Sequence, residues 1–279
     1  MIEQRHLFNL ESKLRKGTKT IPVKALEKDY VLSWILIGIS KSELFDVLCF
    51  KGGTALKKFY FPDYRFSEDL DFTLIKRTTI ENIERTFQKV FAIVLELSNI
   101  RLALKNTEIH ANSYTLIMNF SGPLGADLQR GEIKNDITMD EKLIYPPAVK
   151  ALLREHAEYK DIPDDIKLRV YSLEEIFLEK YLSILDPSRN EPRDVFDLWF
   201  LVSNDCLEYN YLGTQLREKG IYKGVKHFDI IDVFDRKEKN YRTLWTARLE
   251  KHLIELPQFD RVYREIRKCL KPLNESLID

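Results

Sequence analysis

Cysteine is scarce in this chain of 279 residues. Its three cysteines, Cys49, Cys206 and Cys269, are odd in number and far apart, which excludes the disulfide framework of a small secreted domain. The five histidines and three cysteines also lack the spacing of zinc ligands. We therefore expect a reduced, cytoplasmic protein and no zinc enzyme.

Long apolar segments are missing too. The longest run, YVLSWILIGI (30–39), is shorter than the about 20 residues that span a bilayer. The N-terminal stretch MIEQRHLFNLESKLRKG has no apolar core and no small-residue cleavage site, so we expect no signal peptide. The sequence predicts no membrane association and a buried helix over residues 23–41.

The chain has no excess of charge of either sign. Its 44 basic and 44 acidic residues cancel, which argues against nucleic-acid binding by the whole surface but leaves room for a local basic patch. Glycine and proline are sparse, with ten of each, and 44 % of the residues are hydrophobic. This composition favours a folded core, and the length favours two small domains over one.

Apolar periodicity predicts an α+β part followed by a helical part. We expect a buried strand at DVLCF (46–50), a helix over 54–60 and a strand at LDFTLI (70–75). A long helix over 79–98 precedes three antiparallel strand candidates, IRLALKN, SYTLIMNF and GEIKNDIT. After Pro147 the pattern predicts mostly helices. We place the domain boundary so that an α/β domain covers 1–165 and a helical domain covers 166–279.

Two carboxylates lie on the second strand candidate. Asp69 and Asp71 are two residues apart, so both project from one face while Leu70 and Phe72 point to the other. Like charges this close repel each other unless they share a cation. Paired carboxylates on a rigid strand suit Mg²⁺, which keeps positions for water and phosphate oxygens. Taken alone, such a pair is more often a solvated strand face.

A glycine pair directly follows the first strand candidate. Gly52 and Gly53 allow close approach of the backbone to a ligand, and the helix start after them offers N–H groups to a phosphate. The hydroxyl of Thr54 adds a donor. A lone Gly-Gly is usually only a turn, but with Asp69 and Asp71 downstream the pair predicts a site for a metal-bound nucleotide.

The stretch GGTALKKFYFPDYRFSEDLDF (52–72) resembles the first motif of the nucleotidyltransferase superfamily, in which Gly-Ser or Gly-Gly precedes a strand bearing Asp-x-Asp. Its Arg-Phe-Ser-Glu-Asp-x-Asp-Phe segment is similar to the AbiEii-type toxins of bacterial toxin–antitoxin and abortive-infection systems. The resemblance implies a mixed β-sheet flanked by helices and followed by a bundle-like helical domain. It also implies nucleotide-binding roles for Arg65 and Ser67, which lie between the glycines and the aspartates.

The resemblance further implies a third metal-facing carboxylate on a later strand. Asp136 in EIKNDIT fits, and Lys134, expected to bind the nucleotide, shares its strand face. Asp127 and Glu132 are alternatives that could be mistaken for this residue, and Asp136 could also be an ordinary surface group.

Two later motifs are expected on helices. LEEIFLEKYLSIL supplies Lys180, which falls on an apolar helix stripe and so either extends its ammonium outward or meets an anion. PRDVFDLWFL supplies Asp194 and Asp197 on one helix face; the alternative is helix-end stabilisation with an Arg193–Asp197 pair. The resemblance implies a phosphate-directed, catalytic Lys180. It also implies that Asp194, in the catalytic set, or Asp197, in the nucleotide-binding set, orients Lys180 or the base of the nucleotide.

For function, the resemblance implies nucleotidyl transfer from an NTP to RNA, with a tRNA 3′ end as the acceptor and inhibition of translation as the result. Asp69, Asp71 and Asp136 would hold Mg²⁺, or Mn²⁺ in its place, while Gly53 and Thr54 would hold phosphates. A cognate antitoxin is the second implied partner.

The segments YKGVKH, RKEKNYR and RVYREIRK interleave basic and aromatic residues, which agrees with RNA binding, although such helices are more often ordinary solvated faces. The alternatives are a catalytically silent protein that binds NTP or an antitoxin, and nucleotidylation of a protein target. A glycosyltransferase or a nuclease could also use Asp-x-Asp, but the former lacks the upstream Gly-Gly-Thr element and the latter needs no triphosphate cradle.

Overall fold

The computed structural model describes residues 1–125, 128 and 131–278. Within it the chain forms two compact units: a sheet unit, made of Met1–Glu141 and Pro147–Val170, and a helical unit, made of Lys142–Pro146 and Tyr171–Asp279. The division into an α/β domain over 1–165 and a helical domain over 166–279 stays a prediction.

The sheet unit contains four α-helices, a 3-10 turn and seven strands among its described residues. In chain order they are α1 (Gln4–Leu14), α2 (Val23–Ser40), the turn Glu43–Asp46, β1 (Leu48–Lys51), α3 (Gly52–Phe59), β2 (Leu70–Leu74), α4 (Ile80–Ser98), β3 (Arg101–Ile109), β4 (Ser113–Ser121), β5 (Gly131–Thr138), β6 (Ala148–Ala151) and β7 (Lys167–Val170).

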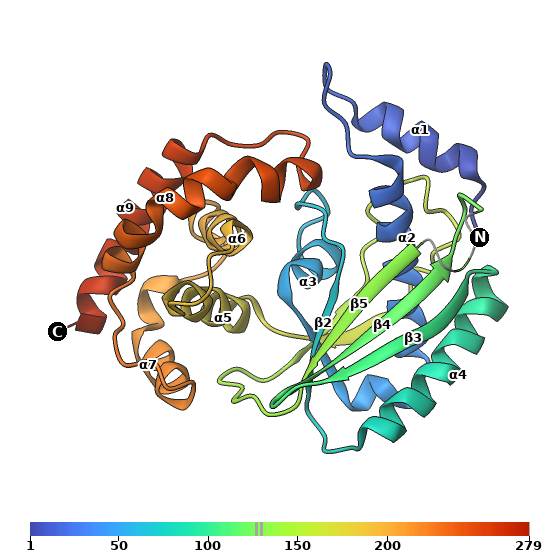
Figure 1. The fold of residues 1–279 in the computed structure, drawn as a ribbon, viewed down its shortest axis with the longest axis horizontal. Coiled ribbons are helices and arrows are strands. Elements are labelled where there is room, and N and C mark those ends of the chain that lie inside the picture. Colours follow the sequence, from blue (N-terminus) through green and yellow to red (C-terminus); the bar gives the residue numbers. More distant parts are fainter. Residues whose placement is uncertain (126–127, 129–130, 279) are drawn as a thin grey trace. The chain divides into compact units, whose positions relative to one another are not determined.

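One mixed sheet holds this unit together. Its strand order is β3-β4-β5-β2-β1-β7-β6 (Figure 1). β2 pairs antiparallel with β1 and parallel with β5, while β3, β4 and β5 are antiparallel neighbours. The predicted α+β class and the antiparallel arrangement of the last three strands are therefore confirmed.

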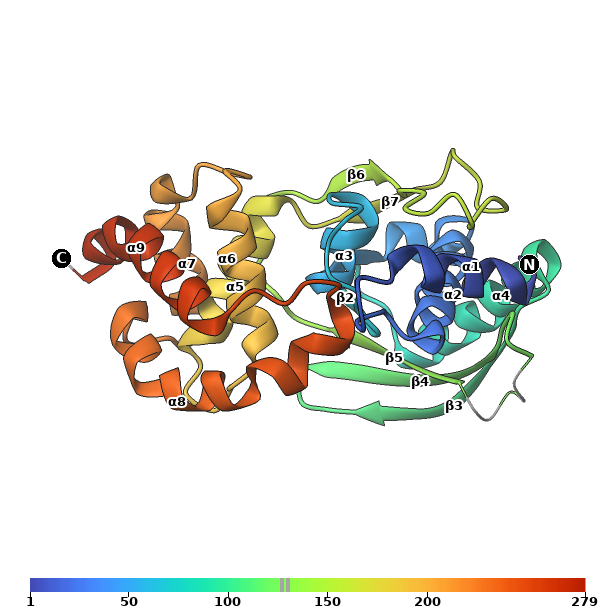
Figure 2. The same cartoon turned by 90° about the horizontal axis from the view of Figure 1, so that it is seen from above.

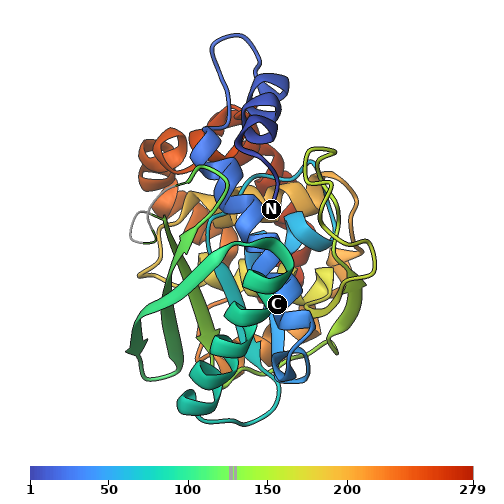
Figure 3. The ribbon, with the colours of Figure 1, turned by 90° about the vertical axis from the view of Figure 1, so that its right-hand side faces the viewer.

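Helices α2 and α4 pack against each other and lie over the sheet (Figures 2 and 3). α2 is apolar on nearly all sides, which is why most of its residues are buried, as predicted. The strand residues that face these helices complete the core. Among them, the ring centroids of Phe50 on β1 and Phe72 on β2 lie 4.9 Å apart. No helix among the described residues is long and apolar enough to cross a membrane.

The expectation of helices directly after Pro147 is wrong. Residues 148–151 and 167–170 form β6 and β7, an antiparallel pair that extends the sheet through β1. Each strand has only four residues, and a long irregular segment separates them. An alternation of apolar and polar residues cannot be recognised in the sequence over so short a span. The position of these strands depends on their pairing with neighbouring strands, which the local sequence does not show.

The helical unit consists mainly of α5 (Leu173–Leu185), α6 (Pro192–Ser203), α7 (Gly213–Tyr222), α8 (Ile230–Leu249) and α9 (Phe259–Ile278). Its fully buried Glu175 accepts hydrogen bonds from the backbone N–H groups of Ile144 and Tyr145, at 3.1 and 2.9 Å. Lys219, which pairs with Glu175, donates to the carbonyl of Lys142. These bonds fasten segment 142–146 to the helices.

A buried cluster of charges joins three parts of the sheet unit. The ammonium of Lys58 on α3 lies 2.9 Å from Asp29 on α2 and 2.7 Å from Glu155, which follows β6. All three side chains are at most 1 % exposed. Burial raises the pKa of Glu155 to about 7, with the charge of Asp29 adding to the effect. For Asp29, the lysines outweigh burial and lower the pKa.

We expect Lys58→Met to destabilise the protein by about 3–5 kcal/mol, because it removes the cation that bridges two buried carboxylates and leaves Lys57, 3.6 Å from Glu155, to offset their charge. Chemical denaturation measures the loss. The matched control is Lys76→Met, which removes an exposed pair with Asp46 at 3.8 Å and should change nothing measurable. A loss for Lys58→Met no larger than for the control would contradict this role.

His156, beside the cluster, should make stability depend on pH. Burial lowers its pKa from 6.5 to about 4, so its contribution is complete above pH 6.5 and is lost as the pH falls toward 4. The free energy of unfolding of the wild type should therefore drop relative to His156→Gln, by about 1–2 kcal/mol at pH 5. Denaturation of both proteins at pH 7 and 5 tests this. A constant difference would contradict it.

Candidate active site

Three polar side chains meet on one face of the sheet. Asp71 on β2 is the register partner of Asp136 on β5 and of Lys51 on β1. Register partners project from the same side of a sheet, so the two carboxylates are neighbours on adjacent strands. Asp69 directly precedes the first residue of β2. The structure thus brings Asp71 and Asp136 together, while the metal-binding role expected of all three carboxylates stays a prediction.

Threonines hold two of these aspartates in place. The hydroxyl of Thr54 on α3, only 1 % exposed, donates to the backbone carbonyl of Asp69 at 2.6 Å. On β4, Thr115 donates to the carboxylate of Asp136. Thr54 therefore fixes the start of β2 against the glycine turn; its expected contact with phosphate stays a prediction.

The glycine pair accommodates the protein's own charged groups. Gly52 has a φ of +81°, and a Cβ at this position would lie 2.5 Å from Oδ2 of Asp71. A Cβ on Gly53 would collide with the guanidinium of Arg65, a side chain that is buried. The turn therefore places a carboxylate and a guanidinium beside the start of α3.

The remaining candidates of the sheet unit lie around this face. Lys134 is exposed and lies on the same face of β5 as Glu132 and Asp136. Ser67, in the segment before β2, is half-buried. Asp127 lies outside the described residues. Nothing in these positions assigns a ligand to Lys134 or Ser67, so their nucleotide-binding roles stay predictions.

In the helical unit, Lys180 meets anions instead of solvent. Its ammonium lies 2.7 Å from Asp194 and 2.8 Å from Asp197, and both carboxylates are nearly fully buried. Burial raises the pKa of Asp194, but Lys180 and Arg189 outweigh it, and the pKa is lowered. Arg193 pairs with Glu191, so the alternative pairing of Arg193 with Asp197 is not what the structure contains.

Sequence reasoning missed three cations near these groups. Lys51 lies across from Asp71 and donates to Thr138 at 3.0 Å; its position directly before the glycine pair was the available signal. Arg189 pairs with Asp194 at 2.5 Å. Lys237 donates to the carbonyls of Ile184 and Arg189, which organises the loop between α5 and α6. No spacing rule identifies the last two.

Among the described residues, it is a different acidic group whose ligand atoms lie close enough together to share a metal ion. The ligand atoms of Asp29, Glu155 and His156 all lie within 4.8 Å of one another. The ammonium of Lys58 already bridges the two carboxylates, and a buried cation beside the same oxygens opposes a second one. We interpret this group as the structural ion-pair cluster.

The comparison with protein families decides the classification. Residues 34–265 match the family described as nucleotidyl transferase AbiEii toxin of type IV toxin–antitoxin systems. The chain belongs to this family. It is therefore a nucleotidyltransferase, and the resemblance deduced from the first motif is confirmed.

Solved structures agree on the fold. The nucleotidyltransferase toxin MenT4 from Mycobacterium tuberculosis matches with a TM-score of 0.61 and 18 % identity, over 97 % of this chain and 88 % of that one. JHP933 from Helicobacter pylori matches with a TM-score of 0.59 and 16 % identity, over 92 % and 95 % of the two chains. No curated protein sequence matches.

Gly52→Ala should abolish most nucleotidyl transfer while leaving the protein folded. The new Cβ would displace the carboxylate of Asp71, and the positive φ adds about 1–2 kcal/mol of strain. Initial rates and thermal unfolding measure the two effects. Gly224→Ala is the control, because Gly224 also has a positive φ, of +75°, but a Cβ there meets nothing within 4 Å. Equal activity of the two variants would contradict the role of the close approach.

Proposed function

We propose that this nucleotidyltransferase uses Mg²⁺ and an NTP to transfer a nucleotide to RNA, with tRNA 3′ ends as the acceptor class, and so inhibits translation. The observation that carries the proposal is the pairing of Asp71 with Asp136 on adjacent strands, next to the Gly52 turn. Such a face combines metal ligands with a phosphate-binding helix start.

The residues fit a hard divalent cation. The donors are all carboxylate oxygens, the preferred ligands of Mg²⁺ and Mn²⁺. Gly52 leaves no side chain between α3 and the carboxylate of Asp71. Bound at Asp69, Asp71 and Asp136, the metal would neutralise phosphate charge and lower the pKa of an acceptor hydroxyl.

The chain's own groups orient the reactants. Backbone N–H groups at the start of α3, after Gly53, suit the β- and γ-phosphates. Arg65, held against Gly53, adds positive charge there, as does Lys51 across from Asp71. The carboxylate of Asp136, oriented by Thr115, is the group we assign to the acceptor side. Positioning and charge compensation are the main requirements of phosphoryl chemistry.

Lys180 would act on the phosphates of the nucleotide. Its ammonium is held by Asp194 and Asp197, and the same carboxylates are themselves buried, which supports a fixed direction for the lysine. We assign Asp194 and Asp197 as positioning residues. A cognate antitoxin is the partner that the type IV family implies.

The test incubates the purified protein with Mg²⁺, each labelled NTP in turn, and total RNA or total protein. Label should appear on RNA, and chelation of the metal should abolish it. Asp71→Asn and Asp136→Asn should reduce the rate at least about 10²-fold, and Lys180→Met about 10-fold or more. Asp63→Asn, an exposed aspartate of the same segment, is the control.

Three results would contradict the proposal. Label on protein would assign a protein substrate. Tight NTP binding without transfer would assign a regulatory protein. Full activity of Asp71→Asn would show that this carboxylate takes no part in the reaction.

A further inference from the structure

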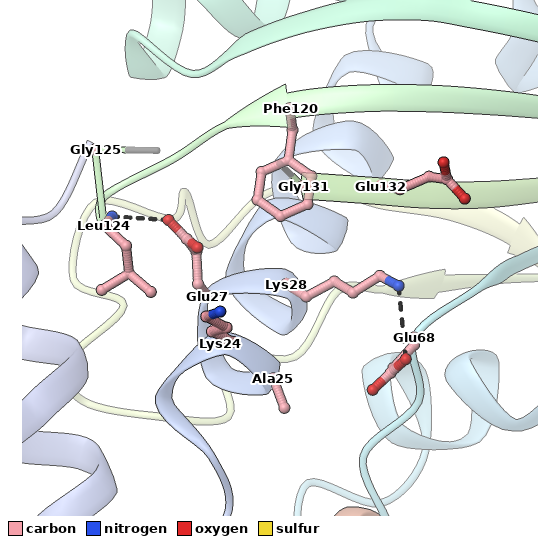
Figure 4. A pocket seen from close by; sticks show the side chains of 10 residues that line it. All are labelled: Lys24, Ala25, Glu27, Lys28, Glu68, Phe120, Leu124, Gly125, Gly131 and Glu132. Atoms are coloured by element: carbon pink, nitrogen blue, oxygen red, sulfur yellow. Dashed lines mark hydrogen bonds and ion pairs between the residues drawn. The ribbon is translucent and has the colours of Figure 1, made fainter. Parts of the chain in front are cut away.

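A cavity of about 500 Å³ lies in the sheet unit, outside the residues assigned above. It is bounded by the first turns of α2, the segment before β2, and strands β4 and β5 (Figure 4). Lys24, Glu27, Lys28, Glu68, Phe120 and Glu132 line it. Its volume falls in the range typical of small-ligand sites.

The cavity lies close to the catalytic carboxylates along the chain. Glu68 directly precedes Asp69. Glu132 and Asp136 are on the same face of β5, and four residues of strand span about 13 Å. A group bound in the cavity and a group reacting at Asp136 can therefore belong to one ligand.

Glu27 is the acceptor that the cavity offers. Its side chain is 5 % exposed, and Oε1 accepts from the N–H of Leu124 at 2.7 Å. Within the described residues it has no second hydrogen bond. Glu132 pairs with Lys105 at 2.7 Å. The second carboxylate oxygen of Glu27 can therefore accept a hydrogen bond from a ligand.

A basic segment leads to this cavity. Between Glu11 and Glu27 the sequence has no acidic residue, and the cations there are Lys13, Arg15, Lys16, Lys19 and Lys24. Backbone bonds of 2.9 and 3.0 Å join Lys16 and Lys19 into a small hairpin between α1 and α2 (Figures 1 and 3). The hairpin residues 15–19 are exposed, and Lys24 lines the cavity itself.

The basic-aromatic segments RKEKNYR and RVYREIRK differ from this segment in sequence, because an acidic residue interrupts each of them. Arg242 pairs with Glu238 and Asp260 at 2.8 and 2.6 Å. Arg261 and Arg267 also pair with acidic side chains. Within the basic segment, Lys13 pairs with Glu158. Because the chain has no net charge, this run of five cations with no acidic residue between them is a local attraction for a polyanion.

We propose that the cavity binds a nucleobase of the single-stranded 3′ end of the acceptor RNA, while the hairpin contacts its phosphates. This inference rests on the proposed function. Glu27 accepts a hydrogen bond from the base, which favours bases with an exocyclic amino group, as glutamate does with cytosine. Lys28 pairs with Glu68 at 3.6 Å inside the cavity (Figure 4). The three glutamates that line the cavity disfavour a phosphate within it, so the backbone of the RNA lies outside along the hairpin lysines.

The acceptor suits the cavity better than the base of the NTP does. The glycine turn, where the phosphates of the NTP are expected, joins β1 to α3. The cavity is lined by residues of β4 and β5, and β2 separates β5 from β1 in the sheet. A basic segment that extends beyond the cavity is also longer than a single nucleotide requires.

Binding of a labelled single-stranded RNA oligonucleotide, without NTP or metal, tests the hairpin. Lys16→Glu/Lys19→Glu and Lys24→Glu should each weaken binding about 10-fold and flatten its salt dependence. Lys41→Glu is the matched control: it follows the last residue of α2, and Lys24 is the second residue of the same helix. Equal weakening by the control, or none by the hairpin variants, would overturn the hairpin's role.

Glu27→Gln tests the cavity, since it keeps an oxygen for the N–H of Leu124. Oligonucleotides ending in cytosine or adenine should lose about 5–10-fold in affinity and uracil should not; KM for RNA should rise while KM for NTP stays constant. A change only in KM for NTP would show that the cavity binds the base of the incoming nucleotide instead of the RNA. No change in either would refute the site.

These outcomes separate the two proposals. RNA binding with the expected variant pattern but no label transfer would sustain the cavity and refute the transferase activity toward RNA. Label transfer to RNA that is insensitive to Glu27 and to the hairpin would sustain the activity and refute the cavity.

Discussion

The pairing of β2 with two different neighbours is the constraint on which the candidate site depends. Antiparallel pairing with β1 sets Lys51 and the glycine turn beside Asp71, and parallel pairing with β5 sets Asp136 on the other side. A shift of one residue in either register would turn these side chains to the buried face. Gly52 completes the constraint, since only a residue without Cβ allows the carboxylate so near α3.

Charged groups throughout the chain are held by partners of the protein itself. Lys58 joins α2, α3 and the segment after β6, so the helix that begins at the glycine turn is anchored at its other end. Lys180 is held by two aspartates of α6. Groups fixed in this way need little reorganisation when charge develops in a reaction, which is the main source of electrostatic catalysis.

Much of the fold follows from local pattern, as the long helix α4 and the antiparallel strands β3 to β5 illustrate. The carboxylates of Asp69 and Asp71 were recognisable because period two places them together. Strands β6 and β7 were not, because four-residue strands depend on partners far away in sequence. Likewise Lys51, Arg189 and the cluster around Lys58 depend on tertiary contacts, which no spacing of residues encodes.

The central claim is that Asp69, Asp71 and Asp136 form the divalent-metal site of a nucleotidyltransferase. Titration with Mn²⁺, followed by electron paramagnetic resonance, distinguishes this site from the group of Asp29, Glu155 and His156. The account predicts that Asp71→Asn weakens Mn²⁺ binding at least about tenfold and that Glu155→Gln leaves it unchanged. Loss of binding in Glu155→Gln, with normal binding in Asp71→Asn, would contradict it.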